Sequence, residues 1–551
     1  MSPLEGVGDM RHRYIVRAVE DPCDGLLAPH NPVDGRRASA WQANIMHARS
    51  IFSIAALVCA AVAWSDQLSA NLHELERGGL HHHRKLCTVT PDPNGGDDAP
   101  AIVQAFSDCN NGGTVEFTNT TYNIKTVMNT TSLSDVIVDL KGTLLWDASD
   151  IPYWLNASLE NGYQNQTSAW HFGGDRIRFY GHDTGTLDGN GQIWYDFVKG
   201  QSNYPRRPHA ITIWNTTNSL FQGIRFVQSQ MWTMTIIHSE QVLLQDIYVN
   251  STSHSSQPAR NTDGADTIYS DRIWFNRWTV DNGDDSIAMK ANSTNILITN
   301  STFYRGLGVA IGSIGQYEGR FETIENVTAS NIVTNRMRHA AYVKTWTGQD
   351  VGDPPNGGGG GFGYAQNLVF SNFTINNNTG IFAIGQCTTF SGASNAGDCN
   401  SSLFNIRDVV VANFTGTVAT PNVVLLQCSA ASPCSDINVQ NIDLAWWSNG
   451  TQIAGYLCSN VASKSGFECT GKTCEKPSTC ISEDPQSAYN TLFGGLGRLL
   501  PSAPPVPPGR VSGLPVRPRC RWIAPFPAIL ESARRATLAP PYPQVNGAFG
   551  F

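Results

Sequence analysis

Two short acidic motifs carry the side chains best suited to chemistry: Asn261-Thr262-Asp263-Gly264-Ala265-Asp266 and Gly283-Asp284-Asp285-Ser286. If these carboxyl groups pack together, their mutual repulsion raises at least one pKa, so that one group stays protonated while another stays ionised. Such a pair can hydrolyse a glycosidic bond, because the acid protonates the leaving oxygen and the base activates water. An isolated aspartate pair would more simply cap turns or bind Ca²⁺.

The elements that must position these motifs recur at a long period. Short apolar strands with an Asn or Asp near the middle or end are separated by 23 residues from Ile224 to Ile247, by 31 to Trp278 and by 23 again to Ser301. This spacing is typical of a parallel β-solenoid, whereas a sandwich would show turns every 8–12 residues or so. Coils of a solenoid stack about 4.8 Å apart. The two acidic motifs should therefore meet on one wall, which favours catalysis over capping.

The composition bounds the class of protein. Of 551 residues, 41% are hydrophobic, which excludes wholesale disorder, and 15% are charged, which is below the average of about 25%. The formal net charge of −8 argues against a nucleic-acid partner. Asp97 and Asp98 predict the start of a short helix that ends near Cys109.

The segments outside the solenoid are read from their composition. The apolar run from Ile51 to Ala63 is too short to span a bilayer comfortably and is typical of a secretory signal, with a signal anchor as the alternative. The expected organisation is an upstream extension or gene-model artefact (1–45), a signal peptide (46–65), a flexible linker (66–86), a parallel β-helix catalytic domain (87–492) and a disordered Pro/Arg-rich tail (493–551).

The cysteines and sequons indicate an extracellular protein. Ten of the thirteen Cys lie between Cys87 and Cys480, an even number suited to disulfides in an oxidising compartment. The sequence does not give their pairing, although Cys428 and Cys434 are close enough to close a small loop. Asn-x-Ser/Thr sequons recur from Asn119 to Asn449. We therefore expect a secreted, extracellular, disulfide-bonded glycoprotein with no membrane contact after signal cleavage.

Four ordered motifs resemble those of the polygalacturonases, glycoside hydrolase family 28: Asn261-Thr262-Asp263, Gly283-Asp284-Asp285, Gly306-Leu307-Gly308 and Tyr342-Val343-Lys344. The resemblance covers about residues 85–490. It implies a right-handed parallel β-helix that hydrolyses pectin with inversion and uses no metal or other cofactor. By that resemblance Asp284 is the proton donor, while Asp263 and Asp285 hold and activate the water.

The sequence departs from the family pattern at two positions of the candidate substrate site. Leu307 stands where the family has His, and Tyr342 stands where it has Arg, whereas Lys344 is retained. Arg and Lys together would grip a uronate carboxylate, so the change suits a neutral 6-deoxy sugar such as L-rhamnose. Alternatively, Arg305 or Lys290 replaces the lost charge and galacturonate remains the substrate. The expected substrate-binding residues are Asn261, Leu307, Tyr342 and Lys344.

We therefore expect a monomeric, exo-acting hydrolase that releases galacturonate or α-L-rhamnose from the ends of pectic polysaccharides or oligosaccharides. The Gly357–Gly361 run and the 31-residue coils are expected to wall off one end of its cleft. Two alternatives remain. One is a pectate lyase-like β-helix enzyme, which would need Ca²⁺ and a basic Arg. The other is a non-catalytic carbohydrate-binding protein.

Overall fold

A computed structural model describes residues 84–388, 399–453 and 455–473. The predictions for segments 1–45, 46–65 and 493–551, and for most of 66–86, lie outside these residues. Within the described ranges, no helix has both the length and the apolar character needed to cross a membrane.

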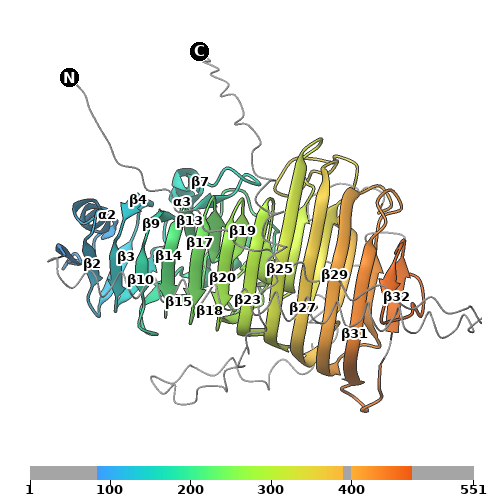
Figure 1. Ribbon diagram of the computed structural model, residues 1–551. Helices are drawn as coiled ribbons and strands as arrows, with labels where there is room; N and C mark the ends of the chain where they lie inside the picture. The colour runs from blue at the N-terminus through green and yellow to red at the C-terminus, as the bar shows by residue number, and fades with distance from the viewer. Residues whose placement is uncertain (1–83, 389–398, 454, 474–551) are drawn as a thin grey trace, which may run out of the picture. The chain divides into compact units, whose positions relative to one another are not determined.

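Parallel strands stack in three faces, and Figure 1 shows them following one another in chain order from β2 to β32. The first face begins with β1 (Leu86–Val89), β2 (Thr114–Phe117), β5 (Ile137–Leu140), β10 (Arg178–Tyr180), β14 (Thr217–Gln222), β17 (Glu240–Gln245) and β20 (Asp271–Asn276). The second begins with β3 (Thr121–Ile124), β6 (Thr143–Trp146), β11 (Thr186–Asp188), β15 (Arg225–Val227), β18 (Tyr248–Asn250) and β21 (Thr279–Asp281).

Long strands then continue these two faces together, because β23 pairs with both β20 and β21. They are β23 (Ser293–Tyr304), β25 (Phe321–Asn335), β27 (Phe362–Asn378), β29 (Leu403–Val418) and β31 (Ser435–Trp446), followed by the short β33 (Lys464–Ser465). The third face contains β4 (Met128–Ser134), β9 (Trp170–Asp175), β13 (Ile211–Trp214), β16 (Met234–Ile237), β19 (Asp266–Ile268), β22 (Asp285–Met289), β24 (Gly308–Ile314), β26 (Ala341–Trp346), β28 (Phe382–Thr388), β30 (Asn422–Gln427) and β32 (Gly455–Ser459). The predicted right-handed parallel β-helix is confirmed.

The strand register reproduces the predicted period in the middle of the stack. Thr217 pairs with Glu240, 23 residues on, and Glu240 pairs with Asp271, 31 residues on. Later coils are longer, because loops are inserted between the faces. The recurrent Asn form a ladder along the long strands, and the backbone φ of each is positive. The ladder starts at Asn300, and each later side chain donates to the one before it at 3.0–3.5 Å: Asn331, Asn372, Asn413 and Asn441.

The core fills the space between the three faces and is closed at its first coil by the predicted helix. This helix, α2 (Ala99–Asp108), lies beside β2 in Figure 1 and packs Phe106 against the aromatic core, with ring centroids 6.3 Å from Phe117 and 5.7 Å from Phe172. Asp98 is its N-cap residue, but its side chain makes no capping bond. Instead, the Asp97 carboxylate accepts from the Ala99 amide at 3.2 Å.

Two further helices, α3 (Ile151–Ala157) and α4 (Gly191–Val198), were not predicted. A small sheet of β7 (Leu159–Glu160), β8 (Thr167–Ser168) and β12 (Pro208–His209) accompanies them in the loops. Four disulfides join Cys87 to Cys109, Cys387 to Cys399, Cys428 to Cys434 and Cys458 to Cys469. The predicted small loop between Cys428 and Cys434 is confirmed, and Cys480 lies outside the described residues.

Candidate active site

The third face presents the candidate site on its outer surface. On β22, Ile287 and Met289 point into the core, while Ala288 belongs to a separate outer cluster. The same alternation on β26 places Tyr342 and Lys344 on the outer surface, in register with Ala310 and Gly312 of β24. Because Ala310 and Gly312 have a small side chain or none, the surface beside Tyr342 and Lys344 is recessed.

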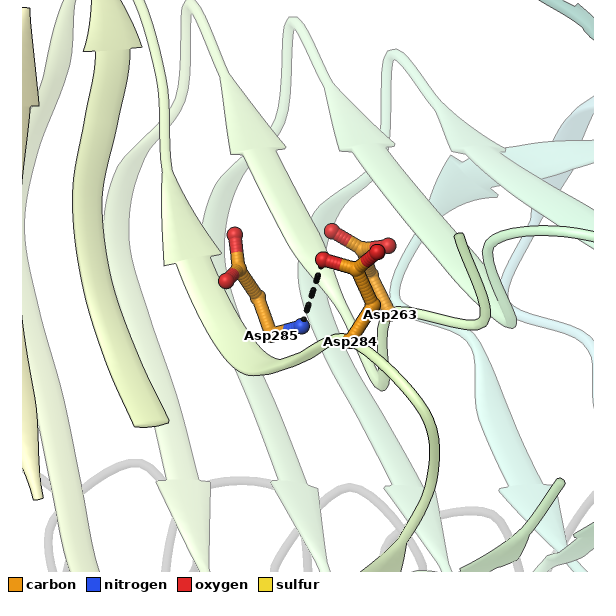
Figure 2. A group of neighbouring side chains, drawn as sticks. All are labelled: Asp263, Asp284 and Asp285. Atoms are coloured by element: carbon orange, nitrogen blue, oxygen red, sulfur yellow. Dashed lines mark hydrogen bonds between the residues drawn. The ribbon is translucent and has the colours of Figure 1, made fainter. Parts of the chain in front are cut away.

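Asp263, Asp284 and Asp285, hereafter the aspartate trio, are brought together as predicted. One carboxylate oxygen of each lies within 4.8 Å of the others. Figure 2 shows the three carboxyl groups projecting to the same side of the strands. Adjacent coils place them there, since the Gly264 amide donates to the Asp285 carbonyl at 3.0 Å. A glycine at 306 is required behind them, because a Cβ would lie 2.3 Å from the Asp284 carbonyl oxygen.

Asp284 is nearly buried and receives three N–H donors. The Asn261 amide and side-chain nitrogen donate to its Oδ2 at 3.0 and 3.4 Å, and the Asp285 amide donates to its Oδ1 at 3.0 Å. Burial and the Asp285 charge nevertheless raise the pKa of Asp284, with Lys344 and Arg260 acting in the opposite direction. A raised pKa suits a group that must hold a proton, but Asp263 shares this property, so the pKa alone does not assign the acid.

Asp285 is fully buried and is held from β26. The Tyr342 hydroxyl donates to its Oδ1, and the Lys344 ammonium lies 3.0 Å from its Oδ2. Both partners occupy alternate positions of the same strand, so one short segment orients this carboxylate. Lys344 also lies 5.2 Å from the centre of the Tyr342 ring.

Asp263 is the member of the aspartate trio whose carboxyl group is least supported by hydrogen-bond donors. Its Oδ1 is buried with no hydrogen-bond partner among the described residues. Burial, followed by the charge of Asp284, raises the pKa of Asp263 well above its usual value. The trio has a spacing that could also hold a metal ion, the alternative raised by the sequence. Tyr342 and Lys344, however, already occupy the Asp285 oxygens.

Leu307 and Tyr342 share an apolar cluster beside the trio. The cluster contains these two side chains with Ala288, Ala310 and Ala383, and Leu425 packs against it. Leu307 and Tyr342 are 5% and 4% exposed and line the same cleft as the aspartates. The two departures from the family pattern therefore belong to one apolar cluster of the cleft.

Three of the other residues considered for the site line the cleft, and one does not. Asn261 and Lys344 line it, as does Lys290, one of the two cations predicted to replace the missing Arg. The other, Arg305, instead pairs with Asp281, with its Nε 2.8 Å from Oδ1, and is not a lining residue. Trp232, which belongs to no family motif, also lines the cleft.

Inserted loops supply lining residues that the motifs did not indicate. Gln164, Ser202, Asn203 and Pro355 come from three separate loops. Amide hydrogen bonds join these loops to one another or to neighbouring segments: Asn203 Nδ2 donates to Asn356 at 3.2 Å, Asn203 N donates to Asn261 at 2.7 Å, and Gln316 Nε2 donates to the Gly357 carbonyl at 2.7 Å. Because these loops have no shared sequence period, the sequence signalled only the loop that carries Pro355, through its Gly357–Gly361 run.

A parallel β-helix that carries a cluster of buried carboxyl groups in an outer cleft has the equipment of a polysaccharide hydrolase. The model of the family described as Glycosyl hydrolases family 28 matches residues 109–469. The chain belongs to this family, and the predicted membership is confirmed. A hydrolase family favours hydrolysis over the lyase alternative.

Individual members of the family resemble the chain over most of its length. An alpha-L-rhamnosidase, rgxB of Aspergillus niger, is 52% identical over 408 residues, which cover 74% of this chain and 94% of the relative. An exopolygalacturonase of Cochliobolus carbonum is 35% identical over 70% of this chain and 86% of its own length. Among solved structures, endo-xylogalacturonan hydrolase from Aspergillus tubingensis is 26% identical, with a TM-score of 0.59 over 70% of this chain and 99% of that chain.

Proposed function

We propose that this chain is a secreted, exo-acting α-L-rhamnosidase that removes terminal rhamnose from rhamnogalacturonan. The observation that carries the proposal is the apolar cluster of Leu307 and Tyr342 beside the trio. A 6-deoxy sugar has a methyl group where galacturonate has a carboxylate, and a methyl group gains free energy from apolar contact. The 52% identity to an alpha-L-rhamnosidase supports the same sugar.

The aspartate trio divides the chemistry in this proposal. Asp284 transfers its proton to the glycosidic oxygen, which leaves with the remaining chain. A water between Asp263 and Asp285 attacks the anomeric carbon and gives up its proton to a carboxylate. Asn261 fixes the acid through its two N–H bonds, and Lys344 with Tyr342 orients Asp285.

The stereochemical outcome is part of the proposal. We propose inversion, as the family resemblance implies. Carboxyl groups of inverting enzymes usually lie about 6.5–9.5 Å apart and those of retaining enzymes about 5–5.5 Å apart. In the trio, one oxygen of each group lies within 4.8 Å of the others, which measures selected oxygens and not the separation between carboxyl groups. The spacing therefore does not carry the choice, and the anomer first released is the measurement that decides it.

The exo mode rests on the joined loops. Hydrogen bonds from Asn203 to Asn356 and from Gln316 to Gly357 connect segments that all contribute to the cleft lining or lie beside it. We propose that they close one end of the cleft, so that only a chain terminus enters. The exopolygalacturonase relative supports an exo-acting enzyme.

Secretion is proposed from the disulfides and the signal-like segment. Four disulfides join cysteines of the described β-helix, which suits an oxidising compartment. Residues 46–65 have the composition of a signal peptide. We also propose a monomer whose partner is the pectic substrate.

The proposal is tested by comparing kcat/KM on rhamnose-terminated rhamnogalacturonan oligosaccharides and on oligogalacturonides of matched length. We expect activity on the first series and at least about a hundredfold less on the second, since an unpaired uronate would be desolvated on an apolar surface. The reverse preference would refute the rhamnosidase and identify an exo-polygalacturonase, with Lys290 as the cation already lining the cleft.

A further inference from the structure

Lys290 is a buried cation in the catalytic cleft that the family motifs do not include. It follows β22 and lines the cleft with Asp263 and Asp284, yet it is only 3% exposed. Burying an ammonium group is costly unless polar partners replace its water. The groups that hold Lys290 therefore indicate what it is positioned to do.

Asp266 is the first of these groups. Its Oδ1 lies 3.2 Å from the Lys290 ammonium, and the carboxylate is fully buried without lining the cleft. Neither of its oxygens accepts a hydrogen bond of normal geometry from the described residues, so the ion pair with Lys290 takes that place. Burial raises the pKa of Asp266 to about 7 although Lys290 acts to lower it. An oxygen of this side chain can hold the ammonium in either protonation state.

Trp232 is the second group. Its ring centre lies 4.7 Å from the Lys290 ammonium, which is within the range of a cation–π contact. The indole is itself stacked on His209, with ring centroids 4.4 Å apart and planes at 23°. His209 is fully buried and hydrogen-bonded to Thr235 at 2.7 Å. Lys290 is thus fixed from two sides by buried groups.

We propose that Lys290 binds the terminal sugar by donating to one of its ring hydroxyls, with Asp266 as the positioning residue that acts through it. An ammonium has three N–H donors, and one carboxylate oxygen and one ring face leave a donor for a ligand in the shared cleft. This inference rests on the proposed function, because it commits to a hydroxyl of a neutral sugar and not to a uronate carboxylate.

The test of the contact uses Lys290→Met with a chromogenic α-L-rhamnoside. Losing a hydrogen bond from a charged donor should raise KM by about tenfold or more, while kcat stays within about threefold. Free rhamnose should inhibit the variant more weakly by a similar factor. The control is Arg305→Met, which removes another cation paired with an aspartate, Asp281, but one outside the cleft lining, and should leave KM unchanged.

The test of Asp266 separates positioning from folding. Asp266→Asn keeps an oxygen acceptor and should retain the wild-type KM within about threefold, whereas Asp266→Val should raise KM as Lys290→Met does. If the valine variant does not fold, the double variant Asp266→Val/Lys290→Met removes both charges of the ion pair, so that neither is left buried without a partner. Its KM should equal that of Lys290→Met, because Asp266 acts only through Lys290.

Four results would overturn the inference. One is an unchanged KM in Lys290→Met, and another is a fall in kcat alone, which would mean that Lys290 acts through the pKa of Asp263. A third is weaker inhibition by galacturonate but not by rhamnose, and the last is a KM for the double variant above that of Lys290→Met. A wild-type enzyme that does not cleave the rhamnoside refutes the proposed function itself, before any variant is compared.

Discussion

Replacing Asp284 by Asn tests the proton donor, because the two side chains have nearly the same shape and only the carboxylic acid can give a proton. General acid catalysis contributes about 10²–10⁴ in rate, or about 3–5 kcal/mol of transition-state stabilisation. We expect a loss of this size on rhamnogalacturonan oligosaccharides, whose leaving sugar oxygen needs protonation. A nitrophenyl α-L-rhamnoside, whose leaving group needs no proton, should lose at most about tenfold.

The fold should tolerate Asp284→Asn. The amide nitrogen must face at least one N–H donor, from Asn261 or from Asp285, and a lost hydrogen bond costs about 1–3 kcal/mol. Removing a buried carboxyl group from beside two others offsets part of this cost. Asp263→Asn is the matched control, since loss of a water-activating group should slow both substrates equally. Equal losses on both substrates in Asp284→Asn would refute its assignment as the acid.

Three further predictions follow from the contacts and charges of the site. Tyr342→Phe removes the hydroxyl that donates to Asp285 but keeps the ring of the apolar cluster, so kcat on the rhamnoside should fall about tenfold or more with little change in KM. A rise in KM alone would mean that the hydroxyl contacts the sugar. The pKa of Asp266, raised by burial to about 7, exceeds that of an unfolded aspartate, about 3.9, so its contribution to stability is complete below about pH 4 and is lost as the pH rises through 7. The thermal midpoint measured by calorimetry should therefore fall between pH 4.5 and 7.5 or so, and fall less in Asp266→Asn; identical slopes would contradict this. Chelation with EDTA should leave turnover unchanged, because the Lys344 ammonium 3.0 Å from Asp285 already supplies the trio with a positive charge and would repel a metal cation; loss of activity that Ca²⁺ restores would show that the trio holds a metal.

The repeating part of the fold could be predicted because successive solenoid coils repeat similar apolar strands at a regular spacing in the sequence. The 23-residue step between apolar strands is the register of Thr217 with Glu240, and the recurrent Asn form the ladder that includes Asn372 and Asn413. The trio followed from the same logic, since motifs one coil apart must stack. Helices α3 and α4 were missed because they lie in insertions between coils, where no period constrains the chain.

The surroundings of the trio were less predictable. Contacts such as Asn203 with Asn356 join residues 153 positions apart through loops that differ in length and composition. The pairing of Arg305 with Asp281 removed one of two cations that the sequence left open, and only the direction of the side chains decided it. Asp266 lies inside a recognised motif, but its link to Lys290 depends on strand register, which a motif does not contain.

Following the first product from a rhamnose-terminated rhamnogalacturonan oligosaccharide tests the exo-rhamnosidase most directly, with chromatography for the identity of the product and NMR for its anomer. We predict free rhamnose as the first product, released as the β-anomer and accompanied by a chain shorter by one sugar. Galacturonate or an internal fragment as the first product would contradict the exo-rhamnosidase, and α-rhamnose would contradict inversion.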